Sequence, residues 1–236
     1  MKQLKNWDNK TWLSSSTYIK SFTLFLLKKK KLNKNSQILD IGCGRGKIIG
    51  SLFRKLKLTN KPIGIDPVIH KDVDKSIDFK KENIFKFFKS NQNKFDLIMI
   101  KQTLHFFNKV KRIKLIKICK KNLSKNGVLL ILSLNTLKNE IPCFKLMKEK
   151  LIKGLERDSK MLNSTCKILK NNKIDKFRFK VSITKNKYIK MLKQRYISCL
   201  VNLTKNQINK GIKEIKEIYP SKILFKDILI CIKYKH

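Results

Sequence analysis

The sequence of 236 residues contains no alanine, only eight glycines and no long hydrophobic run. Its longest apolar runs, Phe22–Leu27 and Gly127–Leu134, are far shorter than the roughly 18 residues that a membrane-spanning helix needs. The lysines of Lys28–Lys31 follow the first run directly, without the small-residue cleavage site of a signal peptide. We therefore expect no membrane span and a cytoplasmic location.

Cysteine and histidine are present but do not cluster. The six cysteines are scattered and form no CxxC pair, and the three histidines do not stand near them in the sequence. Disulfide frameworks and zinc sites both need closely spaced ligands. The spacing therefore argues against either, and we expect no metal.

Acidic residues are scarce, with 16 against 57 basic residues and a formal net charge of +41. Six of the basic residues are arginine and the rest are lysines spread through every segment. Together with abundant asparagine and isoleucine, this indicates the codon bias of a genome poor in G and C, which acts on any surface position. The other interpretation is a polyanionic partner, because so large a field attracts nucleic acid whatever its origin. We recognise no RNA-binding module such as RNP aromatics or a GXXG loop.

Short apolar runs alternate with helical patterns over the first half of the chain. Strands are predicted at Gln37–Ile41, Pro62–Ile65, Ser76–Phe79, Phe95–Ile100 and Val128–Leu134. Helical periodicity covers Lys47–Leu56 and Lys109–Leu123. Continuous apolar strands that alternate with helices predict a parallel sheet covered on both faces.

Different patterns flank this region. Lys5–Leu27 reads as one or two helices, with a cap within Ser14–Ser16. Beyond residue 135, helices are predicted at Phe144–Arg157, Met161–Asn171, Asn186–Leu200 and Gln207–Ile218, and strands at Phe177–Ile183 and Ile223–Tyr234. Thr204 and Gln207 have the spacing of a capping box. No flexible linker is visible, so we expect one domain.

Three glycines stand on alternate positions in the stretch QILDIGCGRGK, residues Gln37–Lys47. Glycine weakens a strand or helix by roughly 0.5–1 kcal/mol relative to alanine, so such a cluster indicates a tight turn or a close approach to the backbone. The spacing of Gly42, Gly44 and Gly46 differs from the dinucleotide pattern GxGxxG, which would need glycine where Lys47 stands.

Two acidic residues accompany the glycine turn. Asp40 precedes it by two residues and is suited to an ammonium group rather than to a pyrophosphate. Asp66 ends the second predicted strand, at the distance along the sequence from which an acid hydrogen-bonds ribose hydroxyls. The combination suits S-adenosylmethionine better than a nicotinamide dinucleotide. It offers an acid for an ammonium group, glycines for a close approach to the backbone and an acid for a ribose.

With these residues in place, the sequence resembles the class I S-adenosylmethionine-dependent methyltransferases of the small-molecule type. The matching segments occur in the family's order: ILDIGCGRG, IGID (Ile63–Asp66), ENI (Glu82–Ile84), FDLIMIKQTLHFF (Phe95–Phe107) and LSKNGVLLIL (Leu123–Leu132). The resemblance implies an α/β, doubly wound Rossmann-like sheet of seven mostly parallel strands, with helices on both faces and the last strand antiparallel. It also implies an N-terminal helical cap at 1–34, a cofactor-binding core at 35–135, and a C-terminal half at 136–236 with a helical insertion before the last strand.

The resemblance also implies the roles of particular residues in binding S-adenosylmethionine. Asp40 and the glycine backbone would hold the methionine part, and Asp66 the ribose. Glu82 or Asn83 would contact the adenine, and Ile100 and Lys101 would face the sulfonium. The full predicted set is Asp40, Gly42, Cys43, Gly44, Gly46, Asp66, Glu82, Asn83, Ile84, Ile100 and Lys101.

The acceptor side is predicted from what surrounds this core. His105 follows the fourth strand and is the candidate general base, where similar small-molecule enzymes often carry histidine; Lys101 and Gln102 could touch the acceptor. Candidate substrate residues are Trp12, Tyr18, Arg195 and Tyr196, the last two in KQRYISCL, which resembles a segment of the trans-aconitate-methyltransferase-like branch. Arginine among so many lysines suggests a planar bidentate donor, for instance to a carboxylate.

The sequence therefore favours methyl transfer to a small-molecule acceptor. The NPPY-type tetrapeptide of amino-methylating enzymes is absent, because its place reads IKQT (Ile100–Thr103). Two alternatives stay open, an RNA methyltransferase and a non-catalytic binding module with the same fold. The methylated atom and the oligomeric state stay open as well.

Overall fold

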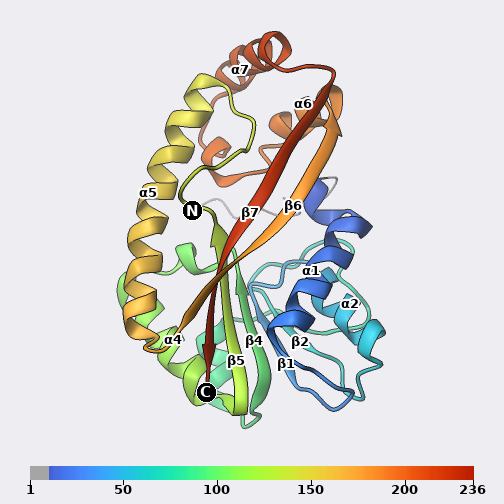
Figure 1. The fold of residues 1–236 in the computed structure, drawn as a ribbon, viewed down its shortest axis with the longest axis vertical. Coiled ribbons are helices and arrows are strands. Elements are labelled where there is room, and N and C mark those ends of the chain that lie inside the picture. The colour runs from blue at the N-terminus through green and yellow to red at the C-terminus, as the bar shows by residue number, and fades with distance from the viewer. Residues whose placement is uncertain (1–10) are drawn as a thin grey trace.

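The computed structural model describes residues 11–236, and in them seven strands form one sheet in the order β3-β2-β1-β4-β5-β7-β6 (Figure 1). The strands are β1 (Ile38–Ile41), β2 (Ile63–Ile65), β3 (Asp78–Lys80), β4 (Phe95–Lys101), β5 (Leu123–Leu134), β6 (Lys173–Thr184) and β7 (Lys222–Lys235). Strands β1 to β5 pair in parallel, and β7 runs antiparallel to both of its neighbours. The predicted fold class is confirmed.

Several helices begin at side-chain caps that the sequence offers. They are η1 (Trp12–Ser14), α1 (Ser16–Lys29), α2 (Lys47–Leu56), α3 (Ile84–Ser90), η2 (Leu104–Phe106), α4 (Lys109–Lys121), α5 (Lys145–Ile168), α6 (Lys185–Lys193), η3 (Ser198–Leu200) and α7 (Lys205–Ile218). The Ser15 hydroxyl accepts from the Tyr18 amide at the start of α1, and Thr204 and Gln207 form the predicted capping box of α7. Residues 5–10 of the predicted N-terminal helix lie outside the described residues.

Three helix predictions are wrong in detail. The polar stretch after Arg157 suggested a break, but α5 continues through it, because the buried positions Leu151, Leu155, Asp158 and Leu162 keep helical spacing. The predicted helix at 186–200 ends at Lys193 and is followed by the short turn η3. Helix α3 was not predicted, because its seven residues are too few for a clear periodicity.

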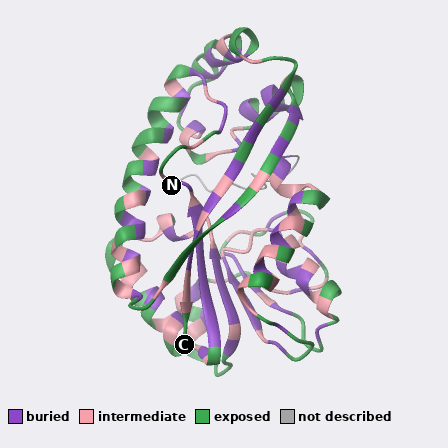
Figure 2. Cartoon of the chain, in the orientation of Figure 1, coloured by how far each residue is buried: buried purple, intermediate pink, exposed green. Residues whose placement is uncertain are grey.

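Each face of the sheet has its own hydrophobic core, and the strands between them are buried (Figure 2). Helices α1 and α2 cover one face, where Tyr18, Phe22 and Leu52 join Leu97 and Met99. Helices α3 and α4 cover the other face together with the second half of α5. Successive residues of a strand point to opposite faces, so the continuous apolar strands serve both cores.

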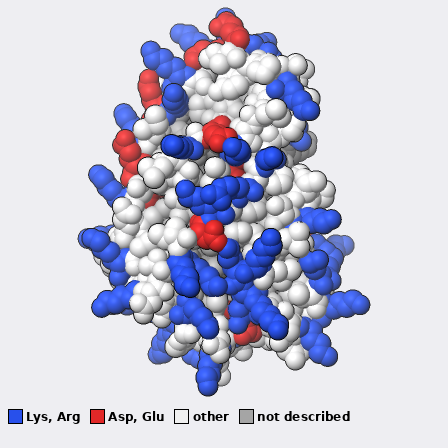
Figure 3. Space-filling view, viewed as in Figure 1, with Lys and Arg blue, Asp and Glu red and all other residues white. Residues whose placement is uncertain are grey.

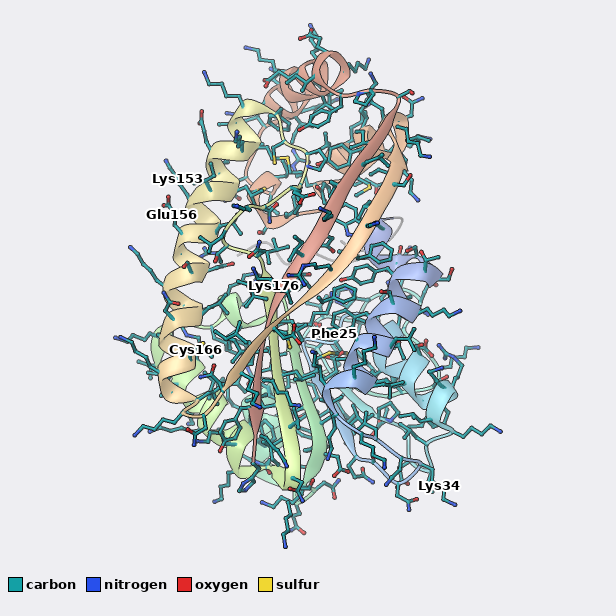
Figure 4. All side chains as sticks on the ribbon, viewed as in Figure 1. Phe25, Lys34, Lys153, Glu156, Cys166 and Lys176 are labelled. Atoms are coloured by element: carbon teal, nitrogen blue, oxygen red, sulfur yellow. The ribbon has the colours of Figure 1, made fainter. Side chains whose placement is uncertain are left out.

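Strands β6 and β7 extend beyond the parallel strands and carry α6, η3 and α7 between them (Figure 1). The predicted helical insertion before the last strand is therefore present. Phe25 of α1 packs on Phe177 of β6 with ring centroids 5.4 Å apart. Lys153 and Glu156 lie on the outer side of α5 (Figure 4). None of the helices within residues 11–236 has the length and apolar composition to cross a bilayer.

Candidate functional site at the carboxyl ends of the strands

The glycine turn joins β1 to α2 through three residues with positive φ. The φ angles of Gly42, Gly44 and Gly46 are 73°, 56° and 67°, a region that other residues rarely adopt. A Cβ atom at Gly42 would lie 2.2 Å from the Thr103 hydroxyl, whereas a Cβ atom at Gly44 would meet nothing within 4 Å. The backbone at Gly44 therefore faces open space, while Gly42 is required by close packing.

Asp40 is buried beside this turn, with an exposed fraction of 4%. No hydrogen-bond partner for its Oδ1 atom occurs among the described residues. Burial raises the pKa of this carboxyl from 3.8 to about 7; the charge of Lys101 opposes the rise and the charge of Asp66 adds to it. A buried carboxyl that lacks a partner is costly, so the position suits a ligand with a positive charge.

Asp66 lies just beyond β2 and connects it to the glycine turn. Its Oδ2 atom accepts from the Gly44 amide at 3.0 Å, and its Oδ1 atom accepts from the Val68 amide at 2.9 Å. The imidazole Nε2 of His70 lies 3.7 Å from the same Oδ1. Each carboxylate oxygen has a second lone pair, so Asp66 can still accept from a pair of ligand hydroxyls.

The predicted adenine contacts lie in the loop after β3, and they differ in whether the side chain is already engaged. The side-chain oxygen Oδ1 of Asn83 accepts from the backbone amide of Phe85 at 2.8 Å and caps α3. Ile84 is buried. The half-buried Glu82 is held by its backbone amide, which donates to the Lys80 carbonyl at 3.0 Å. One lone pair of Asn83 is thus used locally, so we expect Glu82 to be the freer acceptor.

Lys101 ends β4 and lies under α1. Its ammonium is 5.6 Å from the ring centroid of Tyr18 and 5.5 Å from that of Phe22, distances typical of cation–π contacts. Its charge lowers the pKa of two buried acids, Asp40 and Asp227. The neighbouring Ile100 is buried in the core of the opposite face.

The residues after β4 place unpaired polar atoms at the same edge of the sheet. Gln102 has a positive φ of 51°, and its backbone amide donates to the backbone carbonyl of Leu132 at 2.7 Å. Buried Gln102 Oε1 and His105 Nε2 lack partners among the described residues, as does Oδ1 of Asn135 after β5. Unpaired acceptors at one edge indicate a site for a ligand that donates hydrogen bonds.

His105 lies in η2 and is held electrically neutral by its surroundings. Burial lowers the pKa of its imidazole, the Asp158 carboxylate of α5 opposes that effect, and the Arg157 guanidinium adds to it. Arg157 and Asp158 pair with each other at 3.2 Å. A neutral imidazole with an unpaired Nε2 can accept a proton.

The four predicted substrate residues divide into two kinds. Trp12, Tyr18 and Tyr196 are buried; the rings of Trp12 and Tyr196 are 5.4 Å apart, and the Trp12 indole donates to Asp227 at 2.9 Å. Arg195 uses one guanidinium nitrogen to donate to the Leu203 carbonyl at 3.0 Å. The three aromatic residues thus share one region with Asp227. Arg195 instead binds the backbone of the insertion between β6 and β7 to which it belongs.

Two open surface hollows of about 500 Å³ each lie elsewhere. They share Ile63, Asp78 and Asn93, which stand at or before the amino ends of strands. Ligands of parallel sheets bind at the opposite edge. Among the described residues, no group of three or more His, Cys, Asp or Glu side chains is placed to hold a metal ion.

Residues 32–195 match the model of a family described as a methyltransferase domain. The chain belongs to this family. A search of curated proteins finds no match. The resemblance drawn from the glycine turn and its acids is therefore confirmed at the level of the family.

Solved structures of methyltransferases share the fold. A methyltransferase assigned to an antibiotic biosynthesis pathway of Anabaena variabilis superposes with a TM-score of 0.59 at 13% identity, over 89% of this chain and 95% of that one. The plantazolicin methyltransferase BpumL, bound to a desmethylplantazolicin analogue and S-adenosylhomocysteine (SAH), gives 0.54 at 16% identity, over 98% and 88%. An S-adenosylmethionine-dependent methyltransferase from Archaeoglobus fulgidus gives 0.53 at 18% identity, over 94% and 95%.

Sequence reasoning missed one acid of this methyltransferase that the structure places in the site region. Asp227 is 1% exposed and lies on β7, in a run where Phe225, Leu229 and Cys231 are also buried. A period of two along an otherwise apolar strand would have assigned Asp227 to the buried face. A lone acid at such a position is a signal for function, because a buried carboxylate needs a partner.

Proposed function

We propose that the chain transfers a methyl group from S-adenosylmethionine to a small-molecule acceptor. The observation that carries this proposal is the open backbone of Gly44 between two acids, Asp40 with an unpaired buried oxygen and Asp66 with free lone pairs. Family membership and the shared fold support it. The residues fit the donor, because they offer an acid for its ammonium, space against the backbone and an acid for its ribose.

The donor would be held by the residues predicted from the sequence. Asp40 would bind the ammonium, the amides of the glycine turn the carboxylate, and Asp66 the ribose hydroxyls. Glu82 would accept from the adenine amino group, with Asn83 holding the loop through its cap. The cap at 1–34, the core at 35–135, the substrate-side half at 136–236 and the cytoplasmic location stay predictions.

When bound, S-adenosylmethionine supplies a methyl group already activated by a positively charged sulfur. The protein must therefore align the acceptor and, where the acceptor carries a proton, remove it. We assign proton removal to His105 at Nε2, since burial keeps its imidazole neutral. Gln102 and Asn135 offer unpaired carbonyl oxygens that would orient a donor group of the acceptor.

The test has two parts. Calorimetry should give low-micromolar binding of S-adenosylmethionine and SAH and no binding of nicotinamide dinucleotides; the reverse result would remove the donor assignment. A screen of small acceptors with methyl-labelled donor, run beside total cellular RNA, should label a small molecule. A folded protein that binds the donor and labels neither class would favour a binding module.

RNA is the second candidate acceptor, because the net charge of +41 creates a strong attraction for polyanions. In the view of Figure 3, lysine and arginine side chains are distributed over the whole face with uncharged surface between them. We expect RNA to bind at about 50 mM salt, to be released by about 200 mM, and never to be methylated. Stoichiometric label at one RNA position at physiological salt would favour RNA instead.

A further inference from the structure

The backbone of Gln102 adopts a conformation that its side chain disfavours. Its φ angle is 51°, in the left-handed region, where a residue with a Cβ atom costs free energy and glycine does not. Asparagine and aspartate tolerate this region better than glutamine does, because their short side chains bond the local backbone. A strained residue of this kind persists only where the surrounding structure holds it.

Contacts on both sides hold Gln102 in this conformation. Its backbone amide donates to the backbone carbonyl of Leu132 on β5 at 2.7 Å. The hydroxyl of the next residue, Thr103, donates to the Lys101 carbonyl at 3.0 Å and reaches the Gly42 carbonyl at 3.5 Å. The same hydroxyl occupies the space that a Cβ atom at Gly42 would need. The conformation of Gln102 is therefore tied to the turn that we propose binds the donor.

The side chains of Gln102 and Asn135 each present an acceptor atom at the carboxyl edge of the sheet. Oε1 of Gln102 and Oδ1 of Asn135 are buried and have no hydrogen-bond partner within residues 11–236. Asn135 is 4% exposed and stands just beyond the end of β5. Lys101 and Leu132 are directly opposite in the β4–β5 ladder, so both acceptors come from the ends of adjacent strands, where parallel sheets bind ligands.

The orientation of the Asn135 amide determines which kind of group can bind there. Its Nδ2 atom donates to the Leu137 carbonyl, and turning the amide around would break this bond. Asn135 therefore presents an oxygen, which needs an N–H or O–H donor. A carboxylate or an ether has no hydrogen to offer and would leave both oxygens unpaired. The guanidinium Nε of Arg195, unpaired among the described residues, would suit a carboxylate, but it lies in the insertion between β6 and β7.

We propose that Gln102 is a specificity-determining residue whose strained backbone directs Oε1 at the methyl acceptor, and that the acceptor presents a hydroxyl or an amino group to it. The inference rests on the proposed function, since it places the acceptor beside the donor. Asn135 accepts from the same end of the molecule, so the acceptor is an alcohol or an amine at this end and not a carboxylate. The strain is retained because relieving it would turn the oxygen away.

Four probes with the same ring test this chemistry: benzyl alcohol, benzylamine, benzyl methyl ether and benzoate. Their binding to SAH-saturated protein is measured by ligand-observed NMR. The wild-type protein should bind the alcohol or the amine about threefold or more tightly than the ether, as expected for one hydrogen bond, and benzoate no better than the ether. Gln102→Met keeps the length of the side chain without the carbonyl, so this preference should shrink about threefold or more.

A glycine at the same position tests the strain. Gln102→Gly removes the strain and the oxygen together, so the thermal midpoint of the donor-free protein should rise by about 1–4 °C while the preference shrinks as in Gln102→Met. Lys57→Gly is the matched control, because Lys57 is exposed and has a φ of 49° at the end of α2. It should raise the midpoint similarly and leave the preference for the alcohol or amine unchanged.

The outcomes separate the two proposals. No binding of SAH by the wild-type protein would remove the proposed function itself. With SAH bound, tightest binding of benzoate, no binding of any probe, or an unchanged preference in folded Gln102→Met would overturn only the inference about Gln102. No rise in the midpoint of Gln102→Gly would do the same, since Gln102 would then stabilise its loop. If Gln102→Met does not fold, the preference measured in Gln102→Gly decides.

Discussion

The indole of Trp12 donates a hydrogen bond to the carboxylate of Asp227 across 215 residues of sequence, and both side chains are buried. This bond fixes the start of the described chain to its last strand, directly above the carboxyl edge of the sheet. Burial raises the pKa of Asp227, whereas the Trp12 bond and the charge of Lys101 lower it. The same contact thus stabilises the fold and opposes the rise in the pKa of an acid beside the site.

Trp12→Phe should lower the free energy of unfolding by about 1.5–3 kcal/mol, because a buried hydrogen bond to a charged group is lost. Urea unfolding measures this change. In the double variant Trp12→Phe with Asp227→Asn, the two effects should not add, since the second change removes the charge that the first leaves unpaired. Full additivity would show that the bond contributes nothing.

Asp40→Asn should weaken donor binding while stabilising the donor-free protein at pH 8. The pKa of Asp40 is about 7 in the folded chain and about 3.9 in an unfolded one, so the folded state binds more protons between these values. The stability from neutral Asp40 is present at low pH and is lost as pH rises through about 7. The amide avoids that loss, and thermal unfolding at pH 5 and pH 8 should reveal it.

The same carboxyl makes donor binding depend on pH. The groups that act on Asp40 are Lys101 and Asp66, and the half-buried Cys43 thiol lies within reach of its charge. Since the donor needs ionised Asp40, its affinity should fall about tenfold per pH unit below about 7 and level off above, up to the pH at which the donor's own ammonium loses its proton. Calorimetry with SAH measures the profile, and Asp40→Asn should flatten it.

Gly44→Ala and Gly42→Ala should separate binding from folding. The left-handed backbone costs a residue with a Cβ about 1–2 kcal/mol at either position. At Gly44 the added methyl meets open space, so the main effect should be a loss of donor affinity of about tenfold or more. At Gly42 it collides with Thr103, so stability should fall further. Equal donor binding in wild type and folded Gly44→Ala would remove the turn from the site.

Asp66→Ala should reduce donor affinity about tenfold to a thousandfold, because hydrogen bonds to a charged group contribute roughly 1.5–3 kcal/mol each. The carboxylate also holds the Gly44 and Val68 amides, so part of the loss can arise from the loop. Binding of SAH and of its 2′-deoxy analogue separates the two causes. The analogue should bind more weakly to wild type and equally well to the variant; a difference that survives the mutation would argue against contact with the ribose.

His105→Gln should remove an acid-sensitive component of stability. Burial lowers the folded-state pKa of His105. Below about pH 6.5 the unfolded chain therefore binds more protons than the folded one, and the free energy of unfolding decreases as the pH is lowered. Asp158 and Arg157 face this imidazole from α5. Urea unfolding at pH 5.5 and 7.5 should give a smaller difference for the variant than for wild type, and identical differences would contradict a buried neutral imidazole.

The sequence predicted the core of this fold well, because there each signal is local. The run before Gly42 and the run at Phe95–Ile100 are buried on both faces and occur as strands within a few residues of the predicted bounds. The capping box at Thr204 specified the start of α7 through three neighbouring residues. Helix α5 was divided wrongly, since the polar stretch near Asp158 resembles a loop until its packing is known.

A candidate site could be predicted from the sequence for the same reason. The glycine turn and its acids are adjacent in sequence or fall at fixed spacing, so a pattern can reveal them. Asp227 comes to this region only through the pairing of β7 with β5, and its contact with Trp12 depends on the chain's two ends meeting. No local pattern carries such information.

The insertion between β6 and β7 leaves and returns at one point, because Thr184 and Lys222 are directly opposite each other in the ladder. Its tight packing on the rest of the chain includes the contact of Gly211 in α7 with the Phe144 ring, where an added Cβ would lie 2.4 Å from a ring carbon. The segment between the two strand ends is therefore joined to the sheet at a single place. Acceptor preference could change by replacing it, provided that Phe144 keeps a glycine-sized neighbour, while the strands that hold Asp40 and Lys101 stay as they are.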